Sequence, residues 1–406
     1  MREIAIIGAT LSGNKGAASM LQSVLDNLPP LLGEARFNVL SVYPTEDSLI
    51  NTDPQVEIVP ARPLALILAS PLAVLWADAQ RLRLPVGPLR HCRPLAALAR
   101  SELLIDLEGI SFNDKRPIEL GYNVACILPS LIMGKSVMKY SQAMGPFRTP
   151  LNRVMAKAIL PRVKLNVARG QRTRIYLQDL GLMGVPICAD AAFSMHVKET
   201  EESRRALQAL NQFGTRRIIG ISASAVVQSY CKRHAIDYPR AMASFADHAI
   251  DAGYEVWLIA HAVTKSKKGS RTNDIEICNT IYKLLRNNEH CQLIVEDYTP
   301  NTLRAIIGEC DFLIASRFHA MVSSLAKGVP TLVTSWSHKY TEVLEMFGLE
   351  EWAIGHEQLA TSELWDRFEQ LVRSETEIRE KIAQRLPKVI ASSQQNASLA
   401  ISLLEG

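Results

Sequence analysis

Four side chains suited to anion binding and proton transfer follow two neighbouring apolar runs late in the sequence. Phe312 to Ala315 predict a buried strand, and Arg317 and His319 come directly after it, where a helix begins. A second short apolar run leads into a loop that carries His338 and Lys339. Because open parallel sheets bind ligands outside the carboxyl ends of their strands, we expect these four side chains to face one crevice. The cations suit an anionic substrate, and a histidine can transfer a proton near neutral pH.

The scaffold that positions these residues is predicted by apolar, β-rich runs that alternate with helical patterns. In the first half we expect strands at residues 3–8, 37–42, 102–107, 135–141, 165–169 and 186–189, and a helix at 173–180. In the second half we expect strands at 217–222, 255–260, 291–295, 312–315 and 329–334, and helices at 236–252, 274–285 and 299–309. Such alternation is typical of parallel sheets with right-handed crossovers, so the sequence predicts an α/β fold.

The chain is long enough for two domains, since 406 residues exceed one ordinary core. We predict a first Rossmann-like domain over residues 1–197 and a charged helical linker over 198–212. The alternation of strands and helices then restarts, which predicts a second Rossmann-like domain over 213–365. Residues 366–406 are expected to form C-terminal helices that pack back on the first domain.

The segment after the first strand contains a short glycine loop made of Gly13, Asn14, Lys15 and Gly16. Strand, glycine loop and helix together begin a Rossmann-like unit, in which loop amides and the helix N-terminus face a ligand. The amides and Lys15 could contact a phosphate or a sugar. A tight packing turn between strand and helix explains Gly13 equally well. The glycine spacing is not that of a dinucleotide-binding fingerprint.

The composition excludes several classes of protein. A formal net charge of +4 is mild, and a nucleic-acid partner is not expected. The seven cysteines are scattered and form no CxxC pair, which is typical of reduced thiols in a cytosolic protein. No HExxH motif or cluster of aspartates indicates a metal site, so we expect neither a metal nor a cofactor. The chain opens on a strand-like run, and we expect no signal peptide.

The uncharged segment from Pro63 to Ala77 allows two interpretations. It is shorter than the ~20 residues that a spanning helix needs, and Pro71 interrupts it. One interpretation is a buried helix-turn-helix of the first domain. The other is an interfacial element whose Leu64, Leu66 and Leu68 meet a bilayer while basic residues meet anionic headgroups. Those basic residues are Arg81, Arg83, Arg90, His91 and Arg93.

Four blocks of the sequence, in order, carry a resemblance to a known family. They are Gly13-Asn14-Lys15-Gly16-Ala17-Ala18-Ser19-Met20, Ser141-Gln142-Ala143-Met144-Gly145-Pro146, Ser316-Arg317-Phe318-His319-Ala320, and Gly328-Val329-Pro330 leading to Ser337-His338-Lys339. The chain resembles the polysaccharide pyruvyl transferases, which ketalise sugars with pyruvate taken from phosphoenolpyruvate. The resemblance implies two Rossmann-like domains facing a central cleft, as in GT-B glycosyltransferases. Two positions depart from the family pattern. Ala17 stands where many relatives carry an aspartate, and Glu108-Gly109 stands where a double glycine is common.

The resemblance implies a role for each candidate residue. Arg317 binds the phosphate or carboxylate of phosphoenolpyruvate, His319 is the general acid, and Lys339 is a second anion-binding group. His338 is either a second proton carrier or an ordinary loop residue. The other expected substrate-binding residues are Ser337, Gly13, Asn14, Lys15, Gly16, Ser141, Gln142, Gly145, Asp190, Ser222, His261, Asn273 and Asp274. Asn113 and Asp114 are further candidates on the acceptor side, and Asp190 could equally cap the segment that follows it.

Two other functions stay open at this point. A GT-B glycosyltransferase would need a carboxylate for the ribose of a nucleotide sugar, and Glu342 or Glu345 could supply it. A non-catalytic subunit of polysaccharide assembly would keep the fold without turnover. For the pyruvyl transferase, the resemblance implies a saccharide acceptor of a bacterial exopolysaccharide or cell-wall glycan, carried on a lipid. We therefore expect a cytoplasmic enzyme, with peripheral attachment to the inner face of the membrane if the interfacial interpretation holds.

Overall fold

The structure is a computed structural model that describes residues 1–210, 216–263, 273–335, 337–355, 357, 359 and 361–405. Its contacts divide the chain into two compact units. Unit 1 consists of residues 1–12, 20–195 and 391–406, and unit 2 of residues 13–19 and 196–390. The glycine loop therefore belongs to unit 2 although it follows the first strand of unit 1. The end of the predicted linker, residues 211 and 212, lies outside the described residues.

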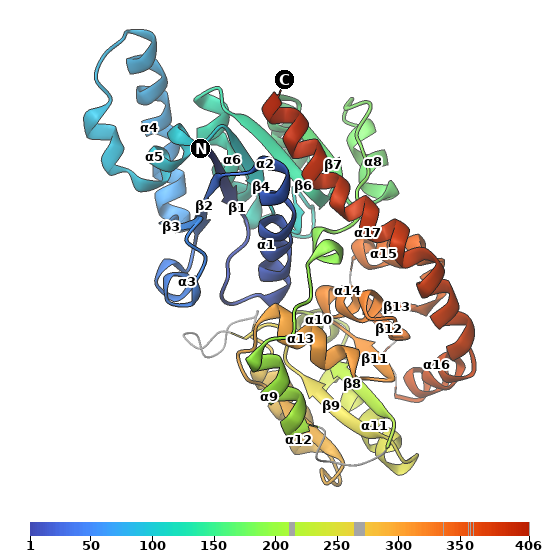
Figure 1. Cartoon of the computed structure of the whole chain (residues 1–406). Coiled ribbons are helices and arrows are strands. Elements are labelled where there is room, and N and C mark those ends of the chain that lie inside the picture. The colour runs from blue at the N-terminus through green and yellow to red at the C-terminus, as the bar shows by residue number, and fades with distance from the viewer. Residues whose placement is uncertain are drawn as a thin grey trace. The chain divides into compact units, whose positions relative to one another are not determined.

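Unit 1 is built on a parallel sheet with strand order β3-β2-β1-β4-β6-β5, and β7 pairs with β6 (Figure 1). The strands are β1 (Arg2–Ile7), β2 (Ala35–Ser41), β3 (Val56–Pro60), β4 (Leu103–Asp106), β5 (Ile110–Ser111), β6 (Ser136–Met144) and β7 (Leu165–Ala168). The helices are α1 (Lys15–Asn27), whose first residues belong to unit 2, α2 (Pro29–Leu32), α3 (Pro44–Ile50), α4 (Pro63–Arg81), α5 (Arg93–Arg100), α6 (Glu119–Ile132), α7 (Pro150–Ile159) and α8 (Gln171–Gln178). Short 3-10 turns are η1 (Gly87–His91), η2 (Leu160–Arg162) and η3 (Ala191–Ser194).

Unit 2 repeats this architecture with strand order β10-β9-β8-β11-β12-β13, all parallel. The strands are β8 (Ile218–Ser222), β9 (Glu255–Ile259), β10 (Cys291–Ile294), β11 (Phe312–Ala315), β12 (Thr331–Ser335) and β13 (Ala353–Gly355). The helices are α9 (Glu201–Leu210), α10 (Ala225–Arg233), α11 (Tyr238–Asp251), α12 (Ile275–Leu284), α13 (Pro300–Gly308), α14 (Phe318–Ala326), α15 (His338–Phe347), α16 (Thr361–Arg373) and α17 (Glu375–Glu405), with a 3-10 turn η5 at Glu350–Trp352.

Both sheets have the strand order of a doubly wound Rossmann fold. In each sheet, the direction in which successive strands are added reverses at one point, while the strands stay parallel. In unit 1 the reversal lies between β1 and β4, and in unit 2 it lies between β8 and β11. The central strands are buried on both faces, as in β11, where all four residues are buried. Ligands of this fold bind at the carboxyl ends of the strands at such a reversal. The residues after β4 and β11 therefore stand where a ligand of each unit would bind.

The structure changes three local predictions. The segment from Pro63 is one continuous helix, α4, that runs through Pro71 to Arg81. The expected strand at 186–189 forms an isolated bridge through Ile187 to Ala168. His338 and Lys339 lie in the first turn of α15 and not in a loop.

The last helix, α17, connects to unit 1 through its C-terminal half. The Ser393 hydroxyl donates to the Asp190 carbonyl at 2.8 Å, and the Asn396 amide donates to the Ala189 carbonyl at 3.2 Å. Close to the end of the chain, Arg2 donates to the Leu404 carbonyl. Residues 391–405 thus form part of unit 1 together with the segment around Asp190.

Candidate active site

Three strands of unit 2 end in a buried set of hydroxyl groups. Ser316 follows β11, and its backbone N–H donates to the carbonyl of Ser222 at the end of β8 (3.0 Å). The Ser316 hydroxyl lies 2.7 Å from the Tyr238 hydroxyl and 2.5 Å from the Thr334 hydroxyl of β12. The hydroxyl of Ser222 is buried and has no hydrogen-bond partner among the described residues. These contacts fix the backbone from which Arg317 projects.

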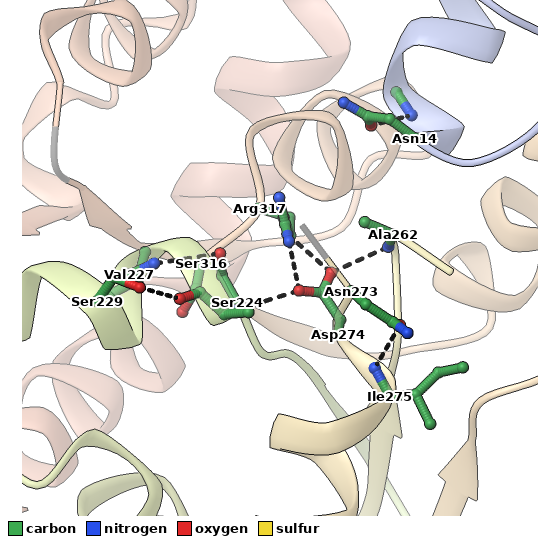
Figure 2. Close-up of polar contacts among 12 residues, drawn as sticks. Asn14, Ser224, Val227, Ser229, Ala262, Asn273, Asp274, Ile275, Ser316 and Arg317 are labelled. Atoms are coloured by element: carbon green, nitrogen blue, oxygen red, sulfur yellow. Dashed lines mark hydrogen bonds and ion pairs between the residues drawn. The ribbon is translucent and has the colours of Figure 1, made fainter. Parts of the chain in front are cut away.

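The Arg317 side chain forms a two-pronged ion pair with Asp274 (Figure 2). Nε donates to one carboxylate oxygen at 2.7 Å, and Nη2 donates to the other. Asp274 also accepts from the backbone amides of Ala225 (3.1 Å) and Ala262 (2.9 Å). Burial raises the pKa of Asp274, and Arg317 and the two amides limit that rise. The carboxylate thus holds the Nε–Nη2 edge of Arg317, the edge that could also bind a phosphate.

His319 lies in the first turn of α14, and its imidazole packs against Gly16 of the glycine loop. A Cβ atom on Gly16 would stand 2.0 Å from Nδ1 of His319, which is far inside van der Waals contact. The Phe318 ring meets the imidazole edge to face, with centroids 4.9 Å apart. The position therefore requires glycine, because any side chain would displace the imidazole.

The glycine loop is held in unit 2 by the backbone and by one ion pair. Asn14 forms an isolated antiparallel bridge with Ala262, and its side-chain oxygen accepts from the Gly16 amide at 3.0 Å. The Lys15 ammonium, which is buried, pairs with Asp297. Gly13 has a positive φ of 77°, which a residue with a side chain adopts with strain. The loop therefore has both a packing role, at Gly13 and Gly16, and a charged group, Lys15.

His261 follows β9, and its buried side chain lies near the charged groups of His319 and Arg317. Burial, and then the charges of His319 and Arg317, lower the pKa of His261 to about 3. The imidazole is therefore neutral at physiological pH, and its expected contribution is hydrogen bonding. Asn273, also buried, accepts from the amide of Ile275 at 3.2 Å and so shapes the start of α12.

Lys339 is placed by aromatic rings next to the end of β11. Its ammonium lies 4.8 Å from the centroid of the Phe318 ring and 5.4 Å from that of Tyr340. The Tyr340 hydroxyl in turn donates to the Ser316 carbonyl at 3.2 Å. Ser337 is the N-cap residue of α15. These contacts place the Lys339 charge beside Phe318 of the Ser316–His319 block.

His338 faces Glu342 one turn further along α15. Its Nε2 lies 3.7 Å from a carboxylate oxygen of Glu342, whose side chain is fully buried. Glu345 is half-buried on the same helix. The carboxylate of Glu342 is thus engaged within its own helix.

In unit 1 the expected acceptor residues surround the end of β6. The Gln142 side chain donates to the Asp106 carbonyl (2.8 Å) and accepts from the Ser111 hydroxyl (2.6 Å). Ser141 has a positive φ of 43°, and its buried hydroxyl has no hydrogen-bond partner among the residues that the structure describes. Gly145, also at positive φ, packs against the ring of Tyr176. Gln142 therefore helps to hold the end of β4, where the sheet of unit 1 reverses.

Sequence reasoning missed a buried acid pair at that reversal. Lys139 pairs with Asp106 at 2.7 Å, and Glu108 accepts from the Asn123 amide at 2.7 Å. Burial, followed by the neighbouring Asp106 carboxylate, raises the pKa of Glu108 from 4.5 to about 8. Gly8, which follows β1, leaves room for the backbone of Glu108, since a Cβ on Gly8 would lie 2.6 Å from the Glu108 nitrogen. Glu108 was noted in the sequence solely as a departure from a double glycine.

The remaining acceptor-side candidates have structural partners. Asp190 caps η3 by accepting from the Ala192 amide (2.9 Å), and it pairs with Arg169 at 3.0 Å. Asn113 donates to the Gly145 carbonyl. Asp114 accepts from the side chain of Asn152 and from residues 148 and 149. The ion pair and buried position of Asp190 add to the capping role that its sequence position indicates.

Comparison with solved structures gives the class of fold. UDP-GlcNAc 2-epimerase from Neisseria meningitidis superposes with a TM-score of 0.63, at 11% identity and full coverage of both chains. Anabaena HepE in complex with UDP-glucose superposes with a TM-score of 0.58 at 12% identity, covering 99% of this chain and all of that one. The chain therefore has the two-Rossmann-unit architecture of GT-B-type glycosyltransferases and epimerases. At such identities the likeness concerns the fold alone.

Sequence comparison gives the family. The family model of the polysaccharide pyruvyl transferases matches residues 14–338, and the chain belongs to that family. The amylovoran biosynthesis protein AmsJ of Erwinia amylovora is 20% identical over 94% of this chain and 95% of that protein. The match begins at Asn14 inside the glycine loop, includes Arg317 and His319, and ends at His338. The protein is accordingly a transferase of polysaccharide biosynthesis.

Proposed function

We propose that the protein transfers pyruvate from phosphoenolpyruvate onto two hydroxyl groups of a saccharide and so forms a ketal. Unit 2 binds the donor and unit 1 binds the acceptor. The supporting observation is the grouping at the end of β11, where Arg317 and His319 lie two residues apart and Lys339 lies over the Phe318 ring between them. This grouping combines an arginine and a lysine with an imidazole, as a donor with a carboxylate and a phosphate requires.

The reaction balances with the groups present. His319 donates a proton to the methylene carbon of the enol, which becomes a methyl group, and positive charge develops at the adjacent carbon. One sugar hydroxyl adds to that carbon and loses its proton to the imidazole. Phosphate then leaves, the second hydroxyl adds, and its proton goes to the departing phosphate. The products are a ketal and inorganic phosphate, and no oxidant or reductant is needed.

Cationic residues have a defined task in this scheme. The donor carries a concentrated negative charge, and charge-assisted hydrogen bonds from arginine and lysine are the strong ones. Arg317 offers its guanidinium while Asp274 fixes its orientation, and Lys339 offers a point charge. His261, neutral because of its burial, adds hydrogen bonding without adding charge. His319 is the side chain to which we assign protonation of the enol carbon.

The second candidate, a nucleotide-sugar glycosyltransferase, has weaker support from the residues that it needs. Glu342, one of two carboxylates that could bind a ribose, is fully buried and faces His338. Glu345 lies a turn further along the same helix and is half-buried. We therefore favour the pyruvyl donor.

The acceptor is proposed to be a lipid-linked precursor of an exopolysaccharide or cell-wall glycan, modified in the cytoplasm. The role of the related amylovoran biosynthesis protein in polysaccharide synthesis supports a glycan acceptor. All seven cysteines are free thiols, and six of them are buried, a usage that suits a reducing compartment.

The test is a donor panel with matched variants. The wild-type protein is incubated with a glycan acceptor and either phosphoenolpyruvate or nucleotide sugars, and phosphate and nucleotide release are measured. We expect phosphate release that depends on acceptor, a loss of about 10²–10⁴-fold in His319→Ala, and no loss in His248→Ala, an exposed histidine of α11. Nucleotide release with sugar transfer would instead establish the glycosyltransferase.

A further inference from the structure

The helix α4 carries two apolar faces, of which the fold uses one. Leu66, Ala69, Ala73 and Trp76 are buried, at 0–4% exposure, and they recur every three or four residues. Leu66 belongs to the main core of unit 1, and Ala73 and Trp76 belong to a smaller apolar cluster that includes Leu95. Because a helix has 3.6 residues per turn, these positions share one face. That face attaches α4 to unit 1.

The opposite face is apolar and exposed. Leu64 (67%), Ile67 (55%), Leu68 (54%), Val74 (45%) and Leu75 (56%) lie on the side of the helix about half a turn away from the buried set. Two more leucines, at positions 82 and 84, are exposed just after the helix (69% and 56%). Figure 1 shows α4 extending beyond the strands of the sheet in unit 1. This surface, residues 64–84, is called the α4 apolar face below.

Positive charge is concentrated around the α4 apolar face. Residues 62–93 contain five arginines and one aspartate, a formal charge of +4, which equals the net charge of the whole chain. The rest of the protein is therefore neutral overall. The arginines at 62, 81, 83, 90 and 93 are all exposed, as is His91, and Asp78 is the single acidic residue of the stretch. An apolar stripe flanked by exposed arginines is complementary to a bilayer with anionic headgroups.

We infer that the α4 apolar face docks on the surface of an anionic lipid bilayer. By length and composition α4 could cross a membrane. Its buried face argues for lying on the surface, because Leu66 and Trp76 would have to leave the core for the helix to cross. This inference does not depend on pyruvyl transfer, although it would bring a lipid-linked acceptor and the enzyme to one surface. The sequence-based expectation that Leu66 meets the bilayer is wrong, because Leu66 is buried in the core of unit 1.

Vesicle sedimentation of the full-length protein tests the inference. We expect binding to vesicles of phosphatidylcholine mixed with phosphatidylglycerol, little binding to phosphatidylcholine alone, and release by high salt. Leu64→Ser/Leu68→Ser should lose most of the bound fraction. The matched control Leu49→Ser/Ile118→Ser, which changes two exposed apolar residues of unit 1 outside this face, should bind as the wild type does.

The charge contribution is tested separately. Arg81→Gln/Arg83→Gln should weaken binding about fivefold for each arginine removed, whereas Arg153→Gln/Arg162→Gln, two exposed arginines of unit 1 elsewhere, should have little effect. All four variants should keep the wild-type melting temperature and activity on a soluble acceptor, so failure of the reaction and failure of docking are distinguishable.

Three results would overturn the inference. The first is a wild-type protein that stays in the supernatant with anionic vesicles at low salt. The second is attachment that resists salt and alkaline extraction, which would indicate a spanning helix. The third is a dimer in light scattering that the Leu64→Ser/Leu68→Ser variant converts to a monomer, with no vesicle binding in either. In that case a second copy of the chain covers this face.

Discussion

Removal of Arg317 should cost stability as well as activity, because of the partner it leaves behind. The Asp274 side chain is 0% exposed and that of Arg317 is 15% exposed. Arg317→Ala would leave a carboxylate in the interior with two backbone amides as its remaining partners. Breaking a buried ion pair from one side typically costs about 3–5 kcal/mol. We expect the free energy of unfolding of Arg317→Ala to fall by about that amount.

A double variant separates the structural role of Arg317 from its proposed role in donor binding. In Arg317→Ala/Asp274→Asn the buried charge is gone, and one amide contact is weakened at a cost of about 1 kcal/mol. Most of the lost stability should therefore return, while activity with phosphoenolpyruvate should not. Arg373→Ala is the control, since its pair with Glu369 lies at the surface of α16, and it should change neither property.

Urea denaturation followed by circular dichroism measures the stability, and phosphate release measures the activity. If Arg317→Ala unfolds at the same urea concentration as the parent, the ion pair does not stabilise unit 2. If the double variant is stable and turns over phosphoenolpyruvate at the parental rate, Arg317 does not bind the donor. Either result would refute the corresponding part of the reasoning.

Three further predictions concern single positions. Lys339→Ala should raise the KM for phosphoenolpyruvate about tenfold or more, since a charged hydrogen bond contributes roughly 1.5–3 kcal/mol, and an unchanged KM would remove Lys339 from the donor site. Gly16→Ala should lower kcat in steady-state assays because its methyl group would overlap the His319 imidazole, and a normal kcat would show that the loop moves freely. Glu108, with its pKa raised to about 8, holds a proton in the folded state between about pH 4.5 and 8 that the unfolded chain releases. Stability should therefore fall as pH rises through that range, by at most about 1.4 kcal/mol per pH unit. In Glu108→Gln that slope should flatten in urea titrations, and an unaltered slope would assign it to another group.

The α/β fold follows from the sequence because both sheets are parallel and central strands such as β8 and β11 are short apolar runs. Strand β11 and the start of α14 lie where the pattern predicts, since Phe312 to Ala315 are bounded by polar residues on both sides. Strand β3 was missed because its five residues include a glutamate and end in a proline. The start of α15 at His338 lies in a predicted loop, because the polar residues before Tyr340 carry no helical periodicity.

The candidate site was harder to predict than the fold, because its decisive contacts join residues far apart in sequence. Arg317 and His319 were found from their position after a strand. The ion pair of Arg317 with Asp274 joins residues 43 positions apart, and the packing of Gly16 against His319 joins residues about 300 positions apart. No local sequence pattern predicts such contacts. Glu108 was missed because a raised pKa depends on burial and on Asp106, which are properties of the folded chain.

The most direct test of the proposed reaction is to run it in deuterium oxide and examine the intact glycan product. Protonation of the enol carbon by His319 takes its proton from a solvent-exchangeable site, so the methyl group of each pyruvate ketal should carry one deuterium. Proton NMR and mass spectrometry of the product measure this directly, with one inorganic phosphate released for each ketal formed. A product without a pyruvate ketal, or a ketal whose methyl group carries no deuterium, would contradict the account.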